Sequence, residues 1–276
     1  GVFLDIAWIK ERIPKGAEHI RKKLPSMYHQ FMQLANIDIT AVPMEVGPTT
    51  HYIMGGIRVD GDTQMSNVPG LFAAGECAAG LHGANRLGGN SLSDLLVFGK
   101  RAGEYAATFA KGHATTRMAS TDADASVAAA LAPFGRSGSP EAPYAIQHEL
   151  QGMMQKLVGI VREDGEMRRA LDGVAALRER SRTVGVHGNR EYNPGWHTAL
   201  DLHHLMTVSE AITRAAIERK ESRGGHFRDD FPDKDAAYAT FNIVLRKGNT
   251  GEMELERRAI PAMPDELKAI IEEQKS

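Results

Sequence analysis

The sequence predicts a mixed α/β region followed by a helical bundle and a small α+β terminal region. Three observations lead to this fold class. Residues 70–101 have the pattern of a strand, a glycine-rich loop and a helix, whereas residues 145–222 carry helical hydrophobic periodicity. Residues 236–276 combine strand-like pieces with a final helix. The length of 276 residues suits one large or two ordinary domains.

The first fifty residues are predicted to form a helix-rich N-terminal region. The segments Ile9–Ile13 and Ala17–Leu24 carry charged faces, and Met27–Ala35 adds an amphipathic turn or two. Pro43 then interrupts any helix, because proline lacks a backbone N–H and clashes with the preceding turn. We expect residues 42–46 to form a strand.

The stretch Pro48–Arg101 organises the rest of the chain. It contains a hydrophobic segment that ends in a carboxylate, GLFAAGE (70–76), and a loop with one arginine, HGANRLGGN (82–90). A helix is expected to open at Ser91. Because binding crevices of open α/β sheets lie where strand ends meet helix N-termini, we expect ligand chemistry in this stretch.

The start of this helix has two notable features. Ser91 is expected to be the N-cap, with Asp94 three positions on as an acidic variant of the capping box. The preceding glycines let the backbone approach a ligand closely, and the free N–H groups favour an anion such as a pyrophosphate. Small and apolar residues recur at helical spacing for packing against a sheet: Leu92, Leu95, Leu96, Gly99, Ala102, Gly103 and Ala106.

Beyond this helix the composition changes twice. Residues 107–143 are rich in Ala, Ser, Thr and Asp, which is typical of an exposed helix end followed by a linker. Helical periodicity then returns over Ala145–Val161, Gly165–Arg182 and His197–Ser222. Near the end, TFNIVLRK and MELERRAI predict strands, the second with charged positions typical of an edge strand, and a helix is expected after Pro264. One face of the first bundle helix carries Leu150, Met153, Met154, Leu157 and Ile160.

Composition excludes several functional classes. The formal net charge of -2 gives no basic field, so nucleic acid is not an expected partner. The one cysteine, Cys77, excludes an internal disulfide and fits a reducing compartment. No apolar run approaches the length of a transmembrane helix.

Several motifs resemble a single family. HYIMGG, GLFAAGE and above all HGANRLGGNSLSDLLVFGKRAG are similar to the flavoprotein subunit of succinate dehydrogenases and fumarate reductases. Farther along, NPGWHTALDL (193–202) and ESRGGHFRDDFP (221–232) resemble that family's helical region. The resemblance spans most of the chain, and the arginine loop is a specific motif within it.

The resemblance implies FAD as the cofactor, bound by a split Rossmann-like domain of which this chain would supply the C-terminal part. No G-x-G-x-x-G follows a strand here. In the resembled family that fingerprint and the proton-shuttling arginine precede the matching part, so we expect the C-terminal portion of a longer flavoprotein, inactive by itself. The implied divisions are the end of a capping domain (1–50), the C-terminal part of the FAD-binding domain (51–112), a linker (113–143), a helical domain (144–232) and a small C-terminal domain (233–276).

The resemblance also implies an activity and partners. The activity would be the interconversion of succinate and fumarate by hydride exchange with FAD, within electron transport and the tricarboxylic acid cycle. Electrons would pass first to an iron–sulfur subunit, then to a membrane quinone, and the indirect partner would be a membrane anchor subunit. The implied location is cytoplasmic, peripheral on the inner face of the cell membrane.

Two residues are expected to bind and orient the substrate as catalytic residues. Arg86 presents a planar guanidinium fork that matches a carboxylate bidentately, and Gly88 and Gly89 leave space beside it. His51 precedes a glycine pair typical of a close-approach loop, and the resemblance implies that it contacts the dicarboxylate. The alternatives are a surface salt bridge for Arg86 and a satisfied histidine at a strand end for His51.

Three residues are expected at the cofactor. Glu76 follows a strand and a glycine, where a carboxylate accepts hydrogen bonds from ribityl or ribose hydroxyls; the alternative is a helix-capping or solvated acid. Ser91 and Leu92 would contribute backbone N–H groups to the flavin, although Leu92 by itself is simply a core residue. His82 lies close to Arg86 in the sequence, and the two alternatives for it are orienting the arginine loop and having no role there.

The remaining candidates favour structural roles. Cys77 has no partner and is expected to be a small buried hydrophobe rather than a nucleophile. No cysteine accompanies the other histidines and their spacing matches no compact zinc pattern, so packing or interface roles are expected. These histidines are His187, His197, His203, His204 and His226.

Two other functions stay open from the sequence. L-aspartate oxidase resembles this chain in the HY–GG, GANR and ESRG-HF elements, but Leu87-Gly88-Gly89 followed by Ser93-Asp94 matches the succinate/fumarate type better. The other alternative is a catalytically incompetent truncated fragment that only docks to partners. An FAD-dependent rise in melting temperature would oppose that alternative.

Overall fold

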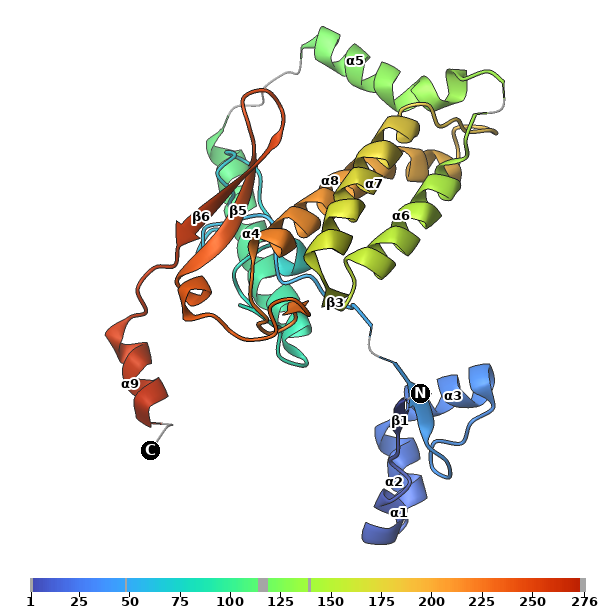
Figure 1. Ribbon diagram of the computed structural model, residues 1–276, viewed down its shortest axis with the longest axis vertical. Helices are drawn as coiled ribbons and strands as arrows, with labels where there is room; N and C mark the ends of the chain where they lie inside the picture. Colours follow the sequence, from blue (N-terminus) through green and yellow to red (C-terminus); the bar gives the residue numbers. More distant parts are fainter. Residues whose placement is uncertain (1, 48, 114–118, 139, 274–276) are drawn as a thin grey trace. The chain divides into compact units, whose positions relative to one another are not determined.

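The computed structural model describes residues 2–47, 49–113, 119–138 and 140–273 (Figure 1). It divides into two compact units, residues 1–50 and residues 51–276. In the described residues the strands form three sheets of two strands each. The open sheet expected of a Rossmann-like domain is therefore not formed by this part of the chain.

The first unit contains three short helices and a two-stranded sheet. The helices are α1 (Ile9–Arg12), α2 (Gly16–Lys23) and α3 (Pro25–Ala35), as the charged and amphipathic faces predict. Strand β1 (Val2–Leu4) pairs antiparallel with β2 (Met44–Val46), which lies in the predicted strand region. The buried side chains that hold this unit together are Ile20, Ile39 and Met44.

The second unit begins with an irregular segment in place of the predicted strand over residues 70–76. That prediction is wrong: these residues form a single bridge, Met65 to Phe72, followed by the 3₁₀ helix η1 (Gly75–Cys77). Gly70 and Gly75 adopt φ values of +84° and +75°. Since extended strands require negative φ, these two glycines end the extended run on both sides.

Helix α4 (Asn90–Gly112) follows the arginine loop. The predicted N-cap at Ser91 is wrong, because Gly89, at a φ of +84°, is the cap and no side chain caps the helix. Leu92, Leu95 and Leu96 are 68%, 52% and 76% exposed, so the expected packing of this face against a sheet does not occur within the described residues. Leu92 is accordingly not a core residue here.

The segment predicted as a linker contains helix α5 (Ser120–Leu131) and the 3₁₀ helix η2 (Ala132–Gly135). Part of this segment is helical because alanine, abundant in α5, has the highest helix propensity. The Trp196 indole N–H donates to the Ala130 carbonyl over 2.7 Å and ties α5 to the bundle. Residues 114–118 and 139 of the predicted linker lie outside the described residues.

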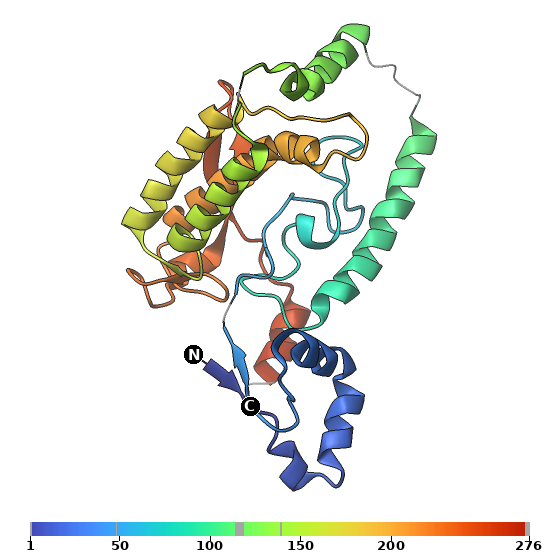
Figure 2. The same ribbon diagram turned by 90° about the vertical axis from the view of Figure 1, so that its right-hand side faces the viewer.

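Three helices form where the helical periodicity returns. Helices α6 (Pro143–Leu157), α7 (Asp164–Ser181) and α8 (Pro194–Glu218) lie side by side in both views (Figures 1 and 2). The side chains of Glu163 and Asn193 cap α7 and α8, each accepting from a backbone N–H three residues on. The core between the helices comprises Ile146, Leu150, Val174, Leu177, Val184, Leu202 and Met206, with Met153 and Met154 packed against it.

The strands and the helix predicted near the end are also present. Strand β5 (Phe241–Lys247) pairs antiparallel with β6 (Met253–Ala259), and α9 (Asp265–Glu273) follows Pro264. A short parallel pair, β3 (Val161–Arg162) with β4 (Phe227–Arg228), and the 3₁₀ helix η3 (Ala236–Thr240) complete the unit. Among the described helices, none combines the length and the hydrophobicity needed to cross a membrane.

Candidate functional site

Arg86 lies in the loop before α4 with its guanidinium only partly satisfied. Its Cζ lies 4.6 Å from the centroid of the Tyr52 ring, a cation–π distance. Nη1 donates to the Leu87 carbonyl over 3.2 Å, while Nε is buried and lacks a hydrogen-bond partner within the described structure. Because an unpaired buried donor is costly, the Arg86 guanidinium is left with unused hydrogen-bonding capacity.

Tyr52 is held from behind by two buried side chains. Its hydroxyl lies 3.2 Å from His82 Nε2 and 3.5 Å from Asp94 Oδ2, and these two atoms are 3.4 Å apart. The side chains of His82 and Asp94 are only 6% and 5% exposed. Burial raises the pKa of Tyr52, and the carboxylates of Asp94 and Glu76 raise it further, so the hydroxyl stays neutral.

His82 thus contacts the aromatic ring over which the Arg86 guanidinium lies. Sequence reasoning missed Tyr52 and assigned Asp94 to helix capping, although an aromatic residue next to His51 and an acid in the first turns of α4 were visible signals. The structure shows that Asp94 turns inward to this cluster instead of capping the helix.

Glu76 links the 3₁₀ helix η1 to the segment around Ile53. Its Oε1 accepts the backbone N–H of Ile53 over 3.0 Å, which links η1 to the segment that carries His51 and Tyr52. The side chain of His51 is exposed to solvent. Cys77, next to Glu76, is exposed as well, so the expectation that it is buried is wrong.

The N-terminus of α4 has the features of a site for an anionic or hydrogen-bonding ligand. Within the described residues the Ser91 N–H has no hydrogen-bond acceptor, whereas the Leu92 N–H donates to the Gly89 carbonyl over 3.3 Å. A side chain at Gly83, Gly88 or Gly89 would meet nothing within 4 Å, so the loop is open. The free N–H, the open loop, the exposed acid Glu76 and the unpaired Arg86 Nε are groups that fit a flavin cofactor, and a guanidinium suits an anion.

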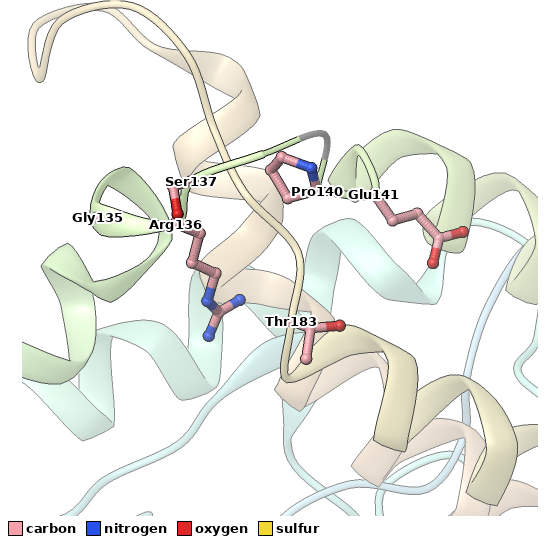
Figure 3. A pocket seen from close by; sticks show the side chains of 6 residues that line it. All are labelled: Gly135, Arg136, Ser137, Pro140, Glu141 and Thr183. Carbon is pink, nitrogen blue, oxygen red and sulfur yellow. The ribbon is translucent and has the colours of Figure 1, made fainter.

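A separate hollow of about 610 Å³ lies at the end of the bundle (Figure 3). It shares no residue with the arginine loop, and its one guanidinium, Arg136, already donates to the Val184 carbonyl. We therefore place the candidate site at the loop. The hollow is lined by Gly135, Arg136, Ser137, Pro140, Glu141 and Thr183.

Two family models match the chain. The model described as FAD binding domain matches residues 6–92, and the model described as Fumarate reductase flavoprotein C-term matches residues 147–269. Together they define a class of protein, the FAD-binding flavoproteins, and FAD is the cofactor of this class.

Named relatives narrow this class. The 8-methylmenaquinol:fumarate reductase flavoprotein subunit of Wolinella succinogenes is 35% identical over 92% of this chain and 41% of its own length. The succinate dehydrogenase flavoprotein subunit of Coxiella burnetii is 36% identical over 85% of this chain and 42% of its own length. The chain belongs to the succinate dehydrogenase and fumarate reductase flavoprotein family.

A solved structure agrees with this assignment. The Mycobacterium smegmatis Sdh1 complex in the apo form contains a chain that superposes with a TM-score of 0.81 at 48% identity. The match covers 96% of this chain and 45% of that chain. This chain therefore spans less than half the length of the relatives it matches.

Proposed function

We propose that this chain carries the dicarboxylate-binding loop of an FAD-dependent oxidoreductase that interconverts succinate and fumarate. The observation that carries the proposal is the buried, unpaired Nε of Arg86 beside an open glycine loop. A guanidinium with an unused donor is suited to a carboxylate, because the pair forms short, charge-assisted hydrogen bonds. Family membership supports a small dicarboxylate as the ligand.

In this proposal each residue near the loop has a defined task. Arg86 binds one carboxylate of the substrate and orients it. Tyr52 keeps the guanidinium in place from below, since its ring faces Arg86 and its hydroxyl is anchored to His82 and Asp94. His51, exposed one residue before Tyr52, binds the second carboxylate. Holding both ends of the substrate lowers the barrier through orientation.

The cofactor would be held by groups at the start of α4 and in η1. The N–H groups of Ser91 and Leu92 would donate to the flavin, for which Leu92 must release its bond to Gly89. Glu76 would accept hydrogen bonds from cofactor hydroxyls. Bound FAD would supply the two-electron acceptor and donor, while the residues of this chain fix the substrate beside it.

The exposed leucines of α4 fit the same proposal. Leu92, Leu95 and Leu96 lie close together in sequence on α4 and are each more than half exposed, and neighbouring exposed apolar side chains are typical of a surface that another part covers. We propose that in the whole protein the remainder of the FAD-binding domain covers them. We propose the same divisions of this chain as the resemblance implies. They are the end of a capping domain (1–50), the C-terminal part of the FAD-binding domain (51–112), a linker (113–143), a helical domain (144–232) and a small C-terminal domain (233–276).

Partners and location are proposed from the family. The solved Mycobacterium smegmatis relative is a complex, which supports electron transfer to an iron–sulfur subunit, with a membrane anchor beyond it. The Wolinella succinogenes relative is named for 8-methylmenaquinol, a quinol. This name supports a quinone as the last electron carrier in the proposed sequence of transfers. In that arrangement the protein would be peripheral at the inner face of the membrane.

A ligand-binding measurement tests the role of Arg86. In the full-length FAD-loaded protein, we expect Arg86→Ala to weaken malonate binding by about 100-fold, since a lost charge-assisted pair costs roughly 3 kcal/mol. The dissociation constant is measured from the change in flavin absorbance, with bound FAD quantified separately. Arg101→Ala is the control, because Arg101 on α4 is a half-exposed partner of Asp62. Equal malonate affinity in both variants would remove Arg86 from the proposed site.

A further inference from the structure

The sequence ESRGGHF forms a tight turn after α8. The Arg223 N–H donates to the His226 carbonyl over 2.8 Å, and the His226 N–H donates back to the Arg223 carbonyl over 3.1 Å. Gly224 and Gly225 lie between them, Gly224 at a φ of +59°. Because this φ is left-handed, glycine suits the position better than other residues.

Buried charges fix both ends of this turn. Glu221 is fully buried and accepts two hydrogen bonds from Arg223, of 2.8 and 2.9 Å, and one of 2.6 Å from Arg219. His226 Nδ1 lies 2.9 Å from Arg162 Nη1, and its Nε2 lies 3.0 Å from the Arg219 carbonyl. The turn is therefore anchored to the end of α8 and to β3.

The apex of the turn contacts the loop that carries Arg86. The Gly225 N–H donates to the Ala84 carbonyl over 2.9 Å. A Cβ at Gly224 would lie 2.5 Å from the Ala84 carbonyl carbon and 2.8 Å from Ala84 Cβ. The nearest atoms to a Cβ at Gly225 would be the end of the Met54 side chain at 3.0 Å, Asn85 Oδ1 at 3.7 Å and the Ala84 carbonyl oxygen at 3.8 Å, so the clash there is milder.

We propose that the Gly224–Gly225 turn is a positioning element that sets where the Arg86 loop presents its guanidinium to the dicarboxylate. The proposal rests on the proposed function. Ala84 is two residues before Arg86, and the glycines Gly83, Gly88 and Gly89 give this loop little stiffness of its own. A fixed hydrogen bond at Ala84 therefore limits the positions that Arg86 can take, and the helical region supplies the fixed point.

The test compares two glycine-to-alanine variants of the full-length FAD-loaded protein. Gly224→Ala forces a clash with Ala84, whereas Gly251→Ala, in the hairpin between β5 and β6, has a φ of +94° and meets nothing closer than 3.8 Å. Both variants bear the cost of alanine at a left-handed φ, so only the clash differs. His226→Ala is a third variant that loosens the anchor without adding atoms.

Three quantities are measured for each variant: bound FAD, the malonate dissociation constant and hydrogen exchange of the peptide over residues 82–90. For Gly224→Ala we expect unchanged FAD content, a malonate dissociation constant raised at least tenfold and faster exchange over 82–90. Gly251→Ala should match the wild type in all three. If Gly224→Ala does not fold, His226→Ala takes its place. A rise of about threefold in its malonate dissociation constant, together with a smaller rise in hydrogen exchange over residues 82–90, then supports the positioning role of the turn.

Two results separate this proposal from the proposed function. Wild-type affinity and wild-type exchange in Gly224→Ala, or in His226→Ala where the former does not fold, would overturn the positioning role. If the wild type does not bind malonate, the proposed function fails. Hydrogen exchange over residues 82–90 then tests the positioning role of the turn by itself. Faster exchange over 82–90 in Gly224→Ala than in Gly251→Ala then supports positioning of the loop, and equal exchange overturns it.

Discussion

Arg86 is supported by an aromatic face, and its Nε has no hydrogen-bond acceptor among the residues that the structure describes. A guanidinium held this way stays in place before the ligand arrives, so little of the binding energy is spent on ordering it. The arrangement gives Tyr52 a task separate from that of Arg86. The ring supports the guanidinium, while the hydroxyl fixes the ring to His82 and Asp94.

Substitutions at Tyr52 distinguish the ring from the hydroxyl. We expect Tyr52→Phe to change the malonate dissociation constant by less than about threefold, because the ring remains under Arg86. Tyr52→Leu removes the cation–π contact, worth about 1 kcal/mol, and should weaken malonate binding by about fivefold. Titration of malonate against flavin absorbance measures both. The ring's proposed role is contradicted if the two variants bind alike.

The sequence selected Arg86 as a candidate but did not show which residues surround it. An arginine in a glycine loop before a helix is a local pattern, and that pattern was sufficient to select it. The contact of Tyr52 with Asp94 joins residues 42 positions apart, and that of Gly225 with Ala84 spans an even longer separation. Such contacts depend on the folded backbone, which periodicity does not specify.

At the scale of elements, the bundle followed its hydrophobic pattern while the segment before α4 did not. Helices α6, α7 and α8 keep a continuous apolar face, so their periodicity was sufficient to predict them. Residues 70–76 are as hydrophobic as many strands, yet the left-handed glycines at 70 and 75 confine pairing to one bridge. The start of α4 was predicted at Ser91 for a similar reason. In the structure Gly89, at a left-handed φ, is the N-cap and the helix begins at Asn90.

The bundle core predicts a stability difference within one helix. Leu202 on α8 is 1% exposed, whereas Leu200 is 38% exposed. Leu202→Ala should lower the free energy of unfolding by about 3 kcal/mol, through lost burial and the cavity left behind. Leu200→Ala should cost less than about 1 kcal/mol. Denaturant unfolding measures both, and similar costs would show that the bundle is packed differently.

The anchor of the Gly224–Gly225 turn predicts a pH dependence. Burial lowers the pKa of His226 to about 4, helped by the charges of Arg162 and Arg228 and opposed by the hydrogen bond to Arg219. The unfolded chain then binds a proton more readily than the folded one, so stability is complete above about pH 6.5 and falls toward pH 4. The expected loss is about 2 kcal/mol.

Glu221 titrates in a separate range. Burial raises its pKa, but hydrogen bonds from Arg223, Asp235 and Arg219 outweigh burial and lower the pKa to about 2. Its contribution is present above about pH 4.5 and is lost as the pH falls toward 2. Unfolding measured from pH 7 to pH 4.5 therefore reports mainly His226. His226→Gln should flatten the dependence of the unfolding free energy on pH over this range. An unchanged slope would show that another group causes the pH dependence.

At the scale of the whole molecule, the chain has the loop that we propose to bind a dicarboxylate and some of the groups that we propose to hold the cofactor. The family models and relatives assign it to flavoproteins more than twice its length. The uncovered leucines of α4 and the free N–H of Ser91 are features that such a longer protein would use. We therefore propose that the full-length flavoprotein acts on a dicarboxylate substrate at this loop.

That claim is tested most directly by mixing the full-length flavoprotein with succinate without oxygen and following the flavin absorbance. We predict that succinate bleaches the flavin band, that L-aspartate does not, and that Arg86→Ala abolishes most of the bleaching by succinate while FAD remains bound. Bleaching by L-aspartate alone would contradict the account, because it would make the arginine loop a binding site for a different substrate.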